Sequence, residues 1–285
     1  MIINKKIIDK FRENGFLEIK SNKIKNEILQ IRKEIKKISI YLLKKDSKIK
    51  INEKISLESL LYKIASKERK KLSKIYDICK TIEGFHKLCA NDKILKVAKY
   101  LLKTDTIFFQ KDFSGIRLDS KLTESQSTLI HQEIHSFPFS INGLVVWIPI
   151  SKVNKENGSI ILWPKTHKKI RKFSGNENKF VKNFKEKKFQ LANKSGKINV
   201  NSSLLKNPLI VNSNIGSVYL LDVRLIHGSY KSSKNNKLMR ITFQNRIFDF
   251  KDPFFQWKLK KYHVNHGLKN PFTAQKLFTK YNNEL

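Results

Sequence analysis

The stretch Ser127-Thr128-Leu129-Ile130-His131-Gln132-Glu133-Ile134-His135 decides how the rest of the chain is interpreted. His131 and Glu133 are two positions apart, and side chains on a β-strand alternate between the two faces of a sheet. If the stretch is a strand, the imidazole and the carboxylate point the same way. Two histidines and one carboxylate form a facial triad that leaves coordination positions of Fe(II) open. The stretch therefore predicts two of the three ligands of such a site.

The third ligand is expected downstream at His227, which opens the segment His227-Gly228-Ser229 behind a strand-like run. Arg240 follows on the next predicted strand, where a guanidinium can form a bidentate salt bridge to the distal carboxylate of 2-oxoglutarate. Arg246 on the same strand is the alternative for that role, or else a surface or substrate contact.

Hydrophobic spacing predicts a mainly helical N-terminal region. Residues 1–20 suggest a short helix that ends at Gly15, followed by a strand. Isoleucines at 24–38, followed by Leu42, recur at intervals of three and four, which indicates an amphipathic helix. Residues 54–80 repeat this pattern, and 93–102 predict a further helix. A coiled coil is possible for the first long helix, but we expect that helix to pack on its own domain.

The pattern changes to short β-rich runs after residue 104. We expect strands at 106–110, 131–135, 144–150, 159–163, 217–222 and 238–247. The runs 144–150 and 159–163 are expected to pair across a polar loop. Short strands after a helical region predict an α+β fold, with a double-stranded β-helix (jelly-roll, cupin-like) core and a helical N-terminal region packed on it.

The chain has a formal net charge of +35, with 51 Lys against 8 Arg. Abundant Lys, Ile and Asn are typical of an AT-rich genome, whereas proteins selected for phosphate recognition rely on Arg. We therefore interpret the charge mainly as a solvated basic surface. The alternative is attraction to an anionic partner such as a phosphorylated metabolite, a carrier or a nucleic acid.

Cys79 and Cys89 follow no metal-type spacing and are expected to be reduced, buried thiols. No apolar run approaches the ~18 residues of a membrane span. Residues 1–11 do not resemble a signal peptide. The expected location is the cytoplasm.

Residues 5–250 resemble the phytanoyl-CoA dioxygenase family of Fe(II)/2-oxoglutarate oxygenases. Several segments match in the right order and together are more specific than any one of them. They are Phe11-Arg12-Glu13-Asn14-Gly15-Phe16, His131-Gln132-Glu133, Trp147-Ile148-Pro149-Ile150, Glu156-Asn157-Gly158-Ser159, Pro164-Lys165-Thr166-His167-Lys168, His227-Gly228-Ser229 and Arg240.

The resemblance implies particular site residues and a particular reaction. It implies iron ligands at His131, Glu133 and His227, a distal-carboxylate site at Arg240 and Ser229, and a pocket wall at Trp147. No catalytic residue beyond the metal ligands is implied. The implied reaction uses Fe(II), 2-oxoglutarate and O2, releases succinate and CO2, and hydroxylates a substrate C–H bond. Glu133 stands where the family usually has Asp, so the carboxylate lies one methylene further out.

The sequence pattern along the chain, together with the resemblance, predicts a domain organisation. One oxygenase domain is expected over 1–285, with a helical region at 1–104 and a jelly-roll core at 105–250. The core contains an insertion at 168–201, expected to be a surface loop or else a lid over the site. The tail at 251–285 is expected to be packed helix and loop.

Two histidines near these motifs have other expected roles. His135 would share a face with His131 and Glu133, as a substrate contact or a structural histidine. His167 is expected to stabilise the loop after Trp163 rather than to bind metal.

Two alternatives to the oxygenase stay open. One is a cupin-like protein that binds metal without turning over 2-oxoglutarate. Glu133, in place of the family's usual Asp, is the feature that favours this alternative. The other is a basic nucleic-acid-binding module, which would interleave aromatics with Arg on one face. The chain has mostly Lys spread along its length, so we do not expect nucleic acid as a partner. We expect a small-molecule or carrier-linked substrate, with an anionic one favoured by the positive charge.

Overall fold

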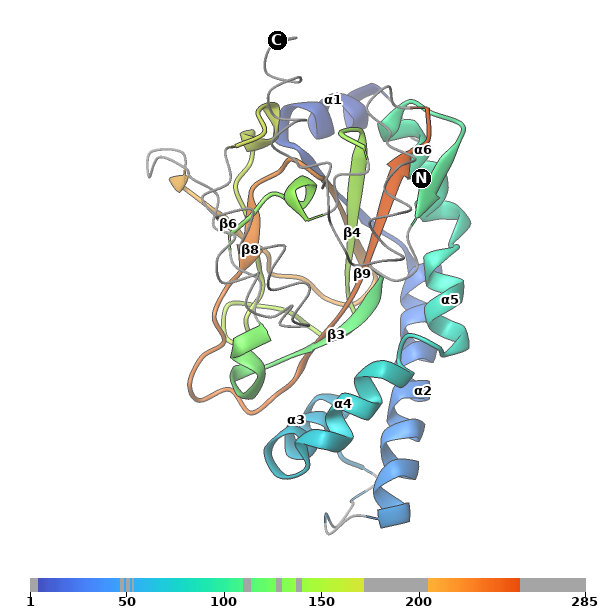
Figure 1. Cartoon of the computed structure of the whole chain (residues 1–285), viewed down its shortest axis with the longest axis vertical. Coiled ribbons are helices and arrows are strands. Elements are labelled where there is room, and N and C mark those ends of the chain that lie inside the picture. The colour runs from blue at the N-terminus through green and yellow to red at the C-terminus, as the bar shows by residue number, and fades with distance from the viewer. Residues whose placement is uncertain are drawn as a thin grey trace, which may run out of the picture.

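The computed structural model describes residues 5–46, 49, 52, 54–109, 114–126, 130–136, 140–171 and 205–251. Helices of the N-terminal region lie along one side of a body built from two antiparallel sheets (Figure 1). The predicted α+β fold, with a jelly-roll core and a helical region packed on it, is confirmed. The predicted insertion and tail fall outside the described residues, apart from 168–171 and 251.

Every segment of the N-terminal region predicted to be helical contains a helix, and a further short helix at Glu83–Cys89 was not predicted. The helices are α1 (Lys5–Asn14), α2 (Asn22–Asp46), α3 (Leu57–Lys67), α4 (Arg69–Ile78), α5 (Glu83–Cys89) and α6 (Asp92–Leu102), with 3-10 turns at Lys121–Gln126, Glu133–His135 and Thr166–Lys168. The helix predicted over 54–80 is divided at Glu68, whose φ of −138° is not helical. The side chains of Ser56 and Asn91 cap α3 and α6. No helix in the described ranges is long and apolar enough to cross a membrane.

The strands form two sheets of different size. They are β1 (Phe16–Lys20), β2 (Ile107–Phe109), β3 (Gly115–Asp119), β4 (Gly143–Pro149), β5 (Ile160–Leu162), β6 (Leu209–Ile210), β7 (Ser217–Asp222), β8 (His227–Ser229) and β9 (Arg240–Asp249). The larger sheet has the order β1-β7-β4-β9-β2, with β3 also paired to β9, and the smaller has the order β6-β5-β8. The predicted pairing of 144–150 with 159–163 is wrong, because the polar connection carries the chain from the larger sheet to the smaller one.

The larger sheet is covered on both faces, which explains why β4 is buried throughout. Val145 and Trp147 belong to the cluster between the sheets. The alternate β4 residues belong to the cluster shared with the helices, which includes the fully buried Ile24, Ile28, Ile31 and Ile35 of α2. The first long helix therefore packs on its own chain, as expected, and the inner sheet face is left for the site.

A partly buried ion pair links the helical region to the sheet. The Arg32 guanidinium on α2 donates to Glu58 of α3 at 2.5 and 3.1 Å, and also to the Ile150 carbonyl at 2.7 Å. Ile150 directly follows β4, so one side chain links two helices to the end of a central strand.

Gly15 forms the junction of α1 and β1, as predicted. Its φ is +78°, and an added Cβ would lie 2.4 Å from Nδ1 of His167. Only glycine adopts this backbone conformation without strain and leaves room for the imidazole. The junction therefore brings the start of the chain against the turn that contains His167.

The two cysteines are free and buried, as predicted. Burial raises the pKa of both the Cys79 and the Cys89 thiol to about 12. Both thiols are therefore protonated and unreactive at neutral pH.

Candidate metal centre

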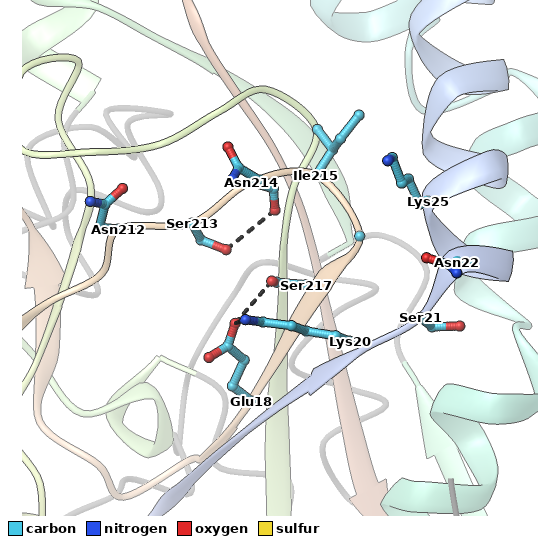
Figure 2. Close-up of a pocket in the computed structure, with 11 residues that line it drawn as sticks. Glu18, Lys20, Ser21, Asn22, Lys25, Asn212, Ser213, Asn214, Ile215 and Ser217 are labelled. Carbon is cyan, nitrogen blue, oxygen red and sulfur yellow. Dashed lines mark hydrogen bonds and ion pairs between the residues drawn. The ribbon is translucent and has the colours of Figure 1, made fainter.

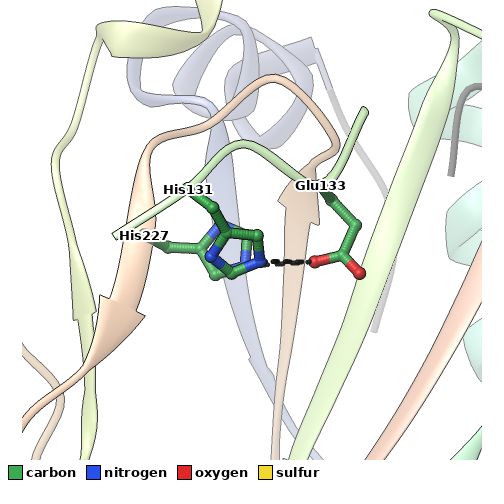
Figure 3. A group of neighbouring side chains, drawn as sticks. All are labelled: His131, Glu133 and His227. Carbon is green, nitrogen blue, oxygen red and sulfur yellow. Dashed lines mark hydrogen bonds and ion pairs between the residues drawn. The ribbon is translucent and has the colours of Figure 1, made fainter. Parts of the chain in front are cut away.

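Three side chains that are far apart in the sequence converge between the two sheets. One ligand atom each from His131, Glu133 and His227 lies within 4.8 Å of the others (Figure 3). Oε2 of Glu133 is 3.1 Å from Nε2 of His131 and 3.3 Å from Nε2 of His227. The two imidazole centroids are 4.3 Å apart. The sequence-predicted ligand set is thus brought together in space.

The local structure that achieves this differs from the predicted strand at 131–135. His131 forms an isolated bridge with His227, in which each backbone N–H donates to the other residue's carbonyl at 2.9 and 3.0 Å. The chain then turns into the 3-10 helix Glu133–His135. The strand prediction is wrong, because only His131 pairs with a neighbouring strand and the following residues turn. The bridge places the imidazoles side by side, and the turn brings the carboxylate to them.

Gln132, between the two ligands, ties this turn to the surrounding structure. It is fully buried, and its amide donates to the carbonyls of Lys169 and Arg224 at 2.8 and 2.5 Å. Its Oε1 accepts from the backbone N–H of Arg171 at 2.7 Å. The sequence alone did not identify this role, because the three partners are backbone groups from two distant segments.

The Glu133 carboxylate is buried and charged. Burial raises its pKa, but the Arg246 guanidinium and the two imidazoles outweigh burial and hold the pKa well below its usual value. Nε and Nη2 of Arg246 lie 2.9 and 2.8 Å from Oε1 of Glu133. One carboxylate oxygen therefore faces the guanidinium, and the other faces the imidazoles.

His227 can present one unprotonated ring nitrogen to a metal ion. Burial and the neighbouring His131 lower its pKa, so the neutral imidazole is favoured. Nδ1 lies 2.9 Å from the Leu225 carbonyl, which can only accept a hydrogen bond, so Nδ1 carries the proton. The lone pair is left on Nε2, which faces Glu133.

Arg240 lies in a second buried charge cluster. By strand alternation, it lies on the same face of β9 as Arg246. Its Nη1 donates to the Gly158 carbonyl at 2.9 Å and its Nη2 to Oδ2 of Asp119 at 2.9 Å. Arg117 pairs with the same carboxylate at 2.9 and 3.2 Å. Burial raises the pKa of Asp119, and the two guanidiniums outweigh burial and lower it. Nε of Arg240 and Oγ1 of Thr242 are buried without a hydrogen-bond partner among the described residues.

The remaining predicted pocket residues lie on strands that border the interior. Ser229 ends β8 and, by strand alternation, shares a face with His227. Trp147 on β4 is 2% exposed and meets Tyr219 edge to face, with ring centroids 5.6 Å apart. Trp147 therefore belongs to the apolar interior between the sheets.

His167 and His135 are not part of the triad. Nε2 of His167 lies 3.0 Å from the carbonyl of Arg12, in the last turn of α1. This contact links the loop after Trp163 to α1, in line with the expected loop-stabilising role of His167. Burial lowers the pKa of His135 to about 4, so it is neutral at physiological pH.

A separate hollow of about 430 Å³ lies where β1, the start of α2 and the loop before β7 meet (Figure 2). It is polar, and Oγ of Ser217 donates to Glu18 within it at 2.9 Å. None of its lining residues belongs to the triad.

The chemistry of these groups matches a ferrous site with an anionic cosubstrate. Two imidazole nitrogens and one carboxylate oxygen form a facial donor set suited to Fe(II). Nε of Arg240 and Oγ1 of Thr242 are donors of the kind that bind a carboxylate, and neither has a hydrogen-bond acceptor in the part of the chain that the structure describes. The residues present therefore fit both groups.

Comparison with known proteins supports this assignment. The family model described as phytanoyl-CoA dioxygenase (PhyH) matches residues 11–238. A search of curated proteins found no match.

Solved structures with the same fold share little sequence identity with the chain. The epimerase SnoN from nogalamycin biosynthesis, in complex with Fe3+, alpha ketoglutarate and nogalamycin RO, has a TM-score of 0.57 at 14% identity, covering 86% of this chain and 83% of that one. The carbocyclase SnoK from the same biosynthesis has a TM-score of 0.52 at 13% identity, covering 87% and 84%. EctD from S. alaskensis, with 2-oxoglutarate and 5-hydroxyectoine, has a TM-score of 0.50 at 14% identity, covering 86% and 76%.

Proposed function

Because the chain belongs to the phytanoyl-CoA dioxygenase family of non-haem iron and 2-oxoglutarate-dependent oxygenases, we propose that it hydroxylates a small or carrier-linked metabolite. Succinate and CO2 are the products from 2-oxoglutarate. The observation that carries the proposal is the convergence of two imidazoles and one carboxylate within 4.8 Å.

The iron ligands in this proposal are His131, Glu133 and His227. Iron, when bound, supplies O2 activation with electrons from 2-oxoglutarate. The protein's part is to present the ligand atoms. His227 offers Nε2 because Nδ1 is held by the Leu225 carbonyl, and Glu133 offers Oε2 because Oε1 is held by Arg246.

The distal carboxylate of 2-oxoglutarate is assigned to Arg240 and Ser229. Nε of Arg240 and the neighbouring Thr242 hydroxyl support this assignment, because both are buried without a hydrogen-bond partner among the residues that the structure describes. Arg246, the alternative, is engaged by Glu133, which also favours Arg240. Trp147, in the apolar cluster between the sheets, closes the inner side of the site and excludes water from it.

The remaining parts of the proposal concern organisation and substrate. We assign residues 1–285 to one oxygenase domain that acts in the cytoplasm, where its two free cysteines stay reduced. The net charge of +35 favours an anionic substrate through long-range attraction.

Iron-dependent succinate release tests the proposal. Purified protein with Fe(II), 2-oxoglutarate and O2 is expected to release succinate, and His227→Ala is expected to abolish this release with the circular dichroism spectrum unchanged. His86→Ala, an exposed histidine on α5, is the matched control. Metal binding without succinate release would favour the cupin-like alternative, and full activity in His227→Ala would contradict the ligand assignment.

Arg240→Ala separates cosubstrate binding from metal binding. A charged hydrogen bond is worth about 1.5–3 kcal/mol, so the 2-oxoglutarate concentration for half-maximal succinate release is expected to rise about 10- to 100-fold. An unchanged requirement would assign the carboxylate site to another residue.

A further inference from the structure

We propose that Arg246 is a positioning residue that fixes the orientation of the Glu133 carboxylate, so that Oε2 alone is presented to the metal. The inference rests on the proposed function, because it takes Glu133 as a metal ligand. It adds a residue that the ligand motif does not contain.

The contact between the two side chains is specific. Nε and Nη2 of Arg246 both donate to the same oxygen, Oε1 of Glu133, at 2.9 and 2.8 Å. Oε2 is left facing the two imidazoles at 3.1 and 3.3 Å. A carboxylate with one oxygen held in this way offers a metal a single donor atom.

Glu133 needs such a partner because its side chain is flexible. A glutamate has one more rotatable bond than an aspartate, so more rotamer freedom is lost when its carboxylate is held in place. Two donors from one rigid guanidinium fork fix the position of Oε1, and Oε2 then faces the two imidazoles. The ordering is then already present before a metal binds.

Arg246 is itself held by a rigid frame. It lies within the ten-residue strand β9, opposite Val145 of β4. Its Nη2 donates to Oε1 of Gln244 at 3.3 Å, and its side chain is only 12% exposed. The guanidinium therefore acts as a fixed anchor on the sheet, whereas Glu133 comes from a turn.

The test measures Co(II) affinity by calorimetry on the full chain. Loss of a group that hydrogen-bonds a metal-ligating carboxylate typically costs 10- to 100-fold in affinity. Arg246→Gln is expected to bind Co(II) at least about 10-fold more weakly and to show an altered Co(II) visible spectrum, because the freed Oε1 can join the coordination sphere. Arg32→Gln, which breaks the ion pair with Glu58 in the helical region, is expected to leave both unchanged.

Arg246→Lys separates positioning from charge. Lysine keeps the positive charge but replaces the fork by a single ammonium, so this variant is expected to resemble Arg246→Gln. Wild-type affinity in Arg246→Lys, or unchanged or tighter binding in Arg246→Gln, would overturn the inference. Should Arg246→Gln fail to fold, Arg246→Lys carries the test alone.

Failure of this inference is distinguishable from failure of the proposed function. Wild-type protein that binds no Co(II), or binds it equally well in His227→Ala, contradicts the triad itself. Wild-type binding that depends on His227 but not on Arg246 contradicts only the positioning role.

Discussion

At the scale of single residues, every deeply buried carboxylate of the candidate site is matched by guanidinium groups. Glu133 faces Arg246, and Asp119 faces both Arg117 and Arg240. Removing one partner from such a pair leaves an uncompensated buried charge, which is strongly destabilising. Among the described residues, the cluster around Asp119 carries two guanidinium groups against one carboxylate.

The sequence predicted the triad but not the groups that support it. His131, Glu133 and His227 are identifiable because their types and order match a known pattern. The Gln132 tether and the Arg246 contact were missed, because their partners are set by the folded chain and leave no local signal.

Gln132→Met is expected to lower the free energy of unfolding by about 2–4 kcal/mol. Methionine keeps the approximate shape but removes the side-chain amide that hydrogen-bonds the partly buried backbone groups of Lys169, Arg224 and Arg171. Urea unfolding measures the loss. Gln30→Met, at an exposed glutamine on α2 that bonds Glu34, is the control and is expected to change stability by less than about 0.5 kcal/mol. A decrease of less than about 1 kcal/mol in the free energy of unfolding of Gln132→Met would contradict the stabilising role of the Gln132 hydrogen bonds.

At the scale of elements, the sequence predicted long periodic segments better than short ones. The isoleucine spacing predicted α2, and the β-rich runs predicted β4, β7 and β9. The short strands β3, β6 and β8 were not among the predicted strands, because a few residues carry little periodic signal. The stretch 131–135 was predicted as a strand because its residue types alternate suitably, but its hydrogen bonds form a bridge and a turn.

Gly15→Ala tests the junction between α1 and β1. Alanine at φ +78° is strained, and its Cβ would overlap His167 at 2.4 Å, so we expect a loss of about 2 kcal/mol or more in the free energy of unfolding. Thermal or urea unfolding measures it. In Gly115→Ala the nearest atom is 3.5 Å from the new Cβ, so this control is expected to be tolerated. Equal effects of the two substitutions would contradict the packing at the junction.

At the scale of the whole molecule, stability is expected to depend on buried carboxylates in a chain that is already strongly basic. The folded-state pKa of Asp119 is lowered, so its contribution is present above the unfolded-state pKa and is lost as the pH falls below that value. Protonation also adds to the net charge of +35, which increases repulsion within the compact state.

The free energy of unfolding is therefore expected to fall between pH 5 and pH 3, and to fall less steeply in Asp119→Asn. Urea unfolding at the two pH values gives the two slopes. Asp9→Asn, at an exposed carboxylate 3.9 Å from Arg12, provides the matched control. Identical slopes in wild type and Asp119→Asn would show that this carboxylate is not selectively stabilised in the folded state.

The most direct test of the metal centre is anaerobic titration with Fe(II) and 2-oxoglutarate, followed by visible absorption. Chelation of Fe(II) by 2-oxoglutarate gives a charge-transfer band that requires no knowledge of the substrate. We expect this band to saturate at one iron per chain and to vanish in His227→Ala. No band in the wild-type protein, or an undiminished band in His227→Ala, would contradict an iron site built from His131, Glu133 and His227.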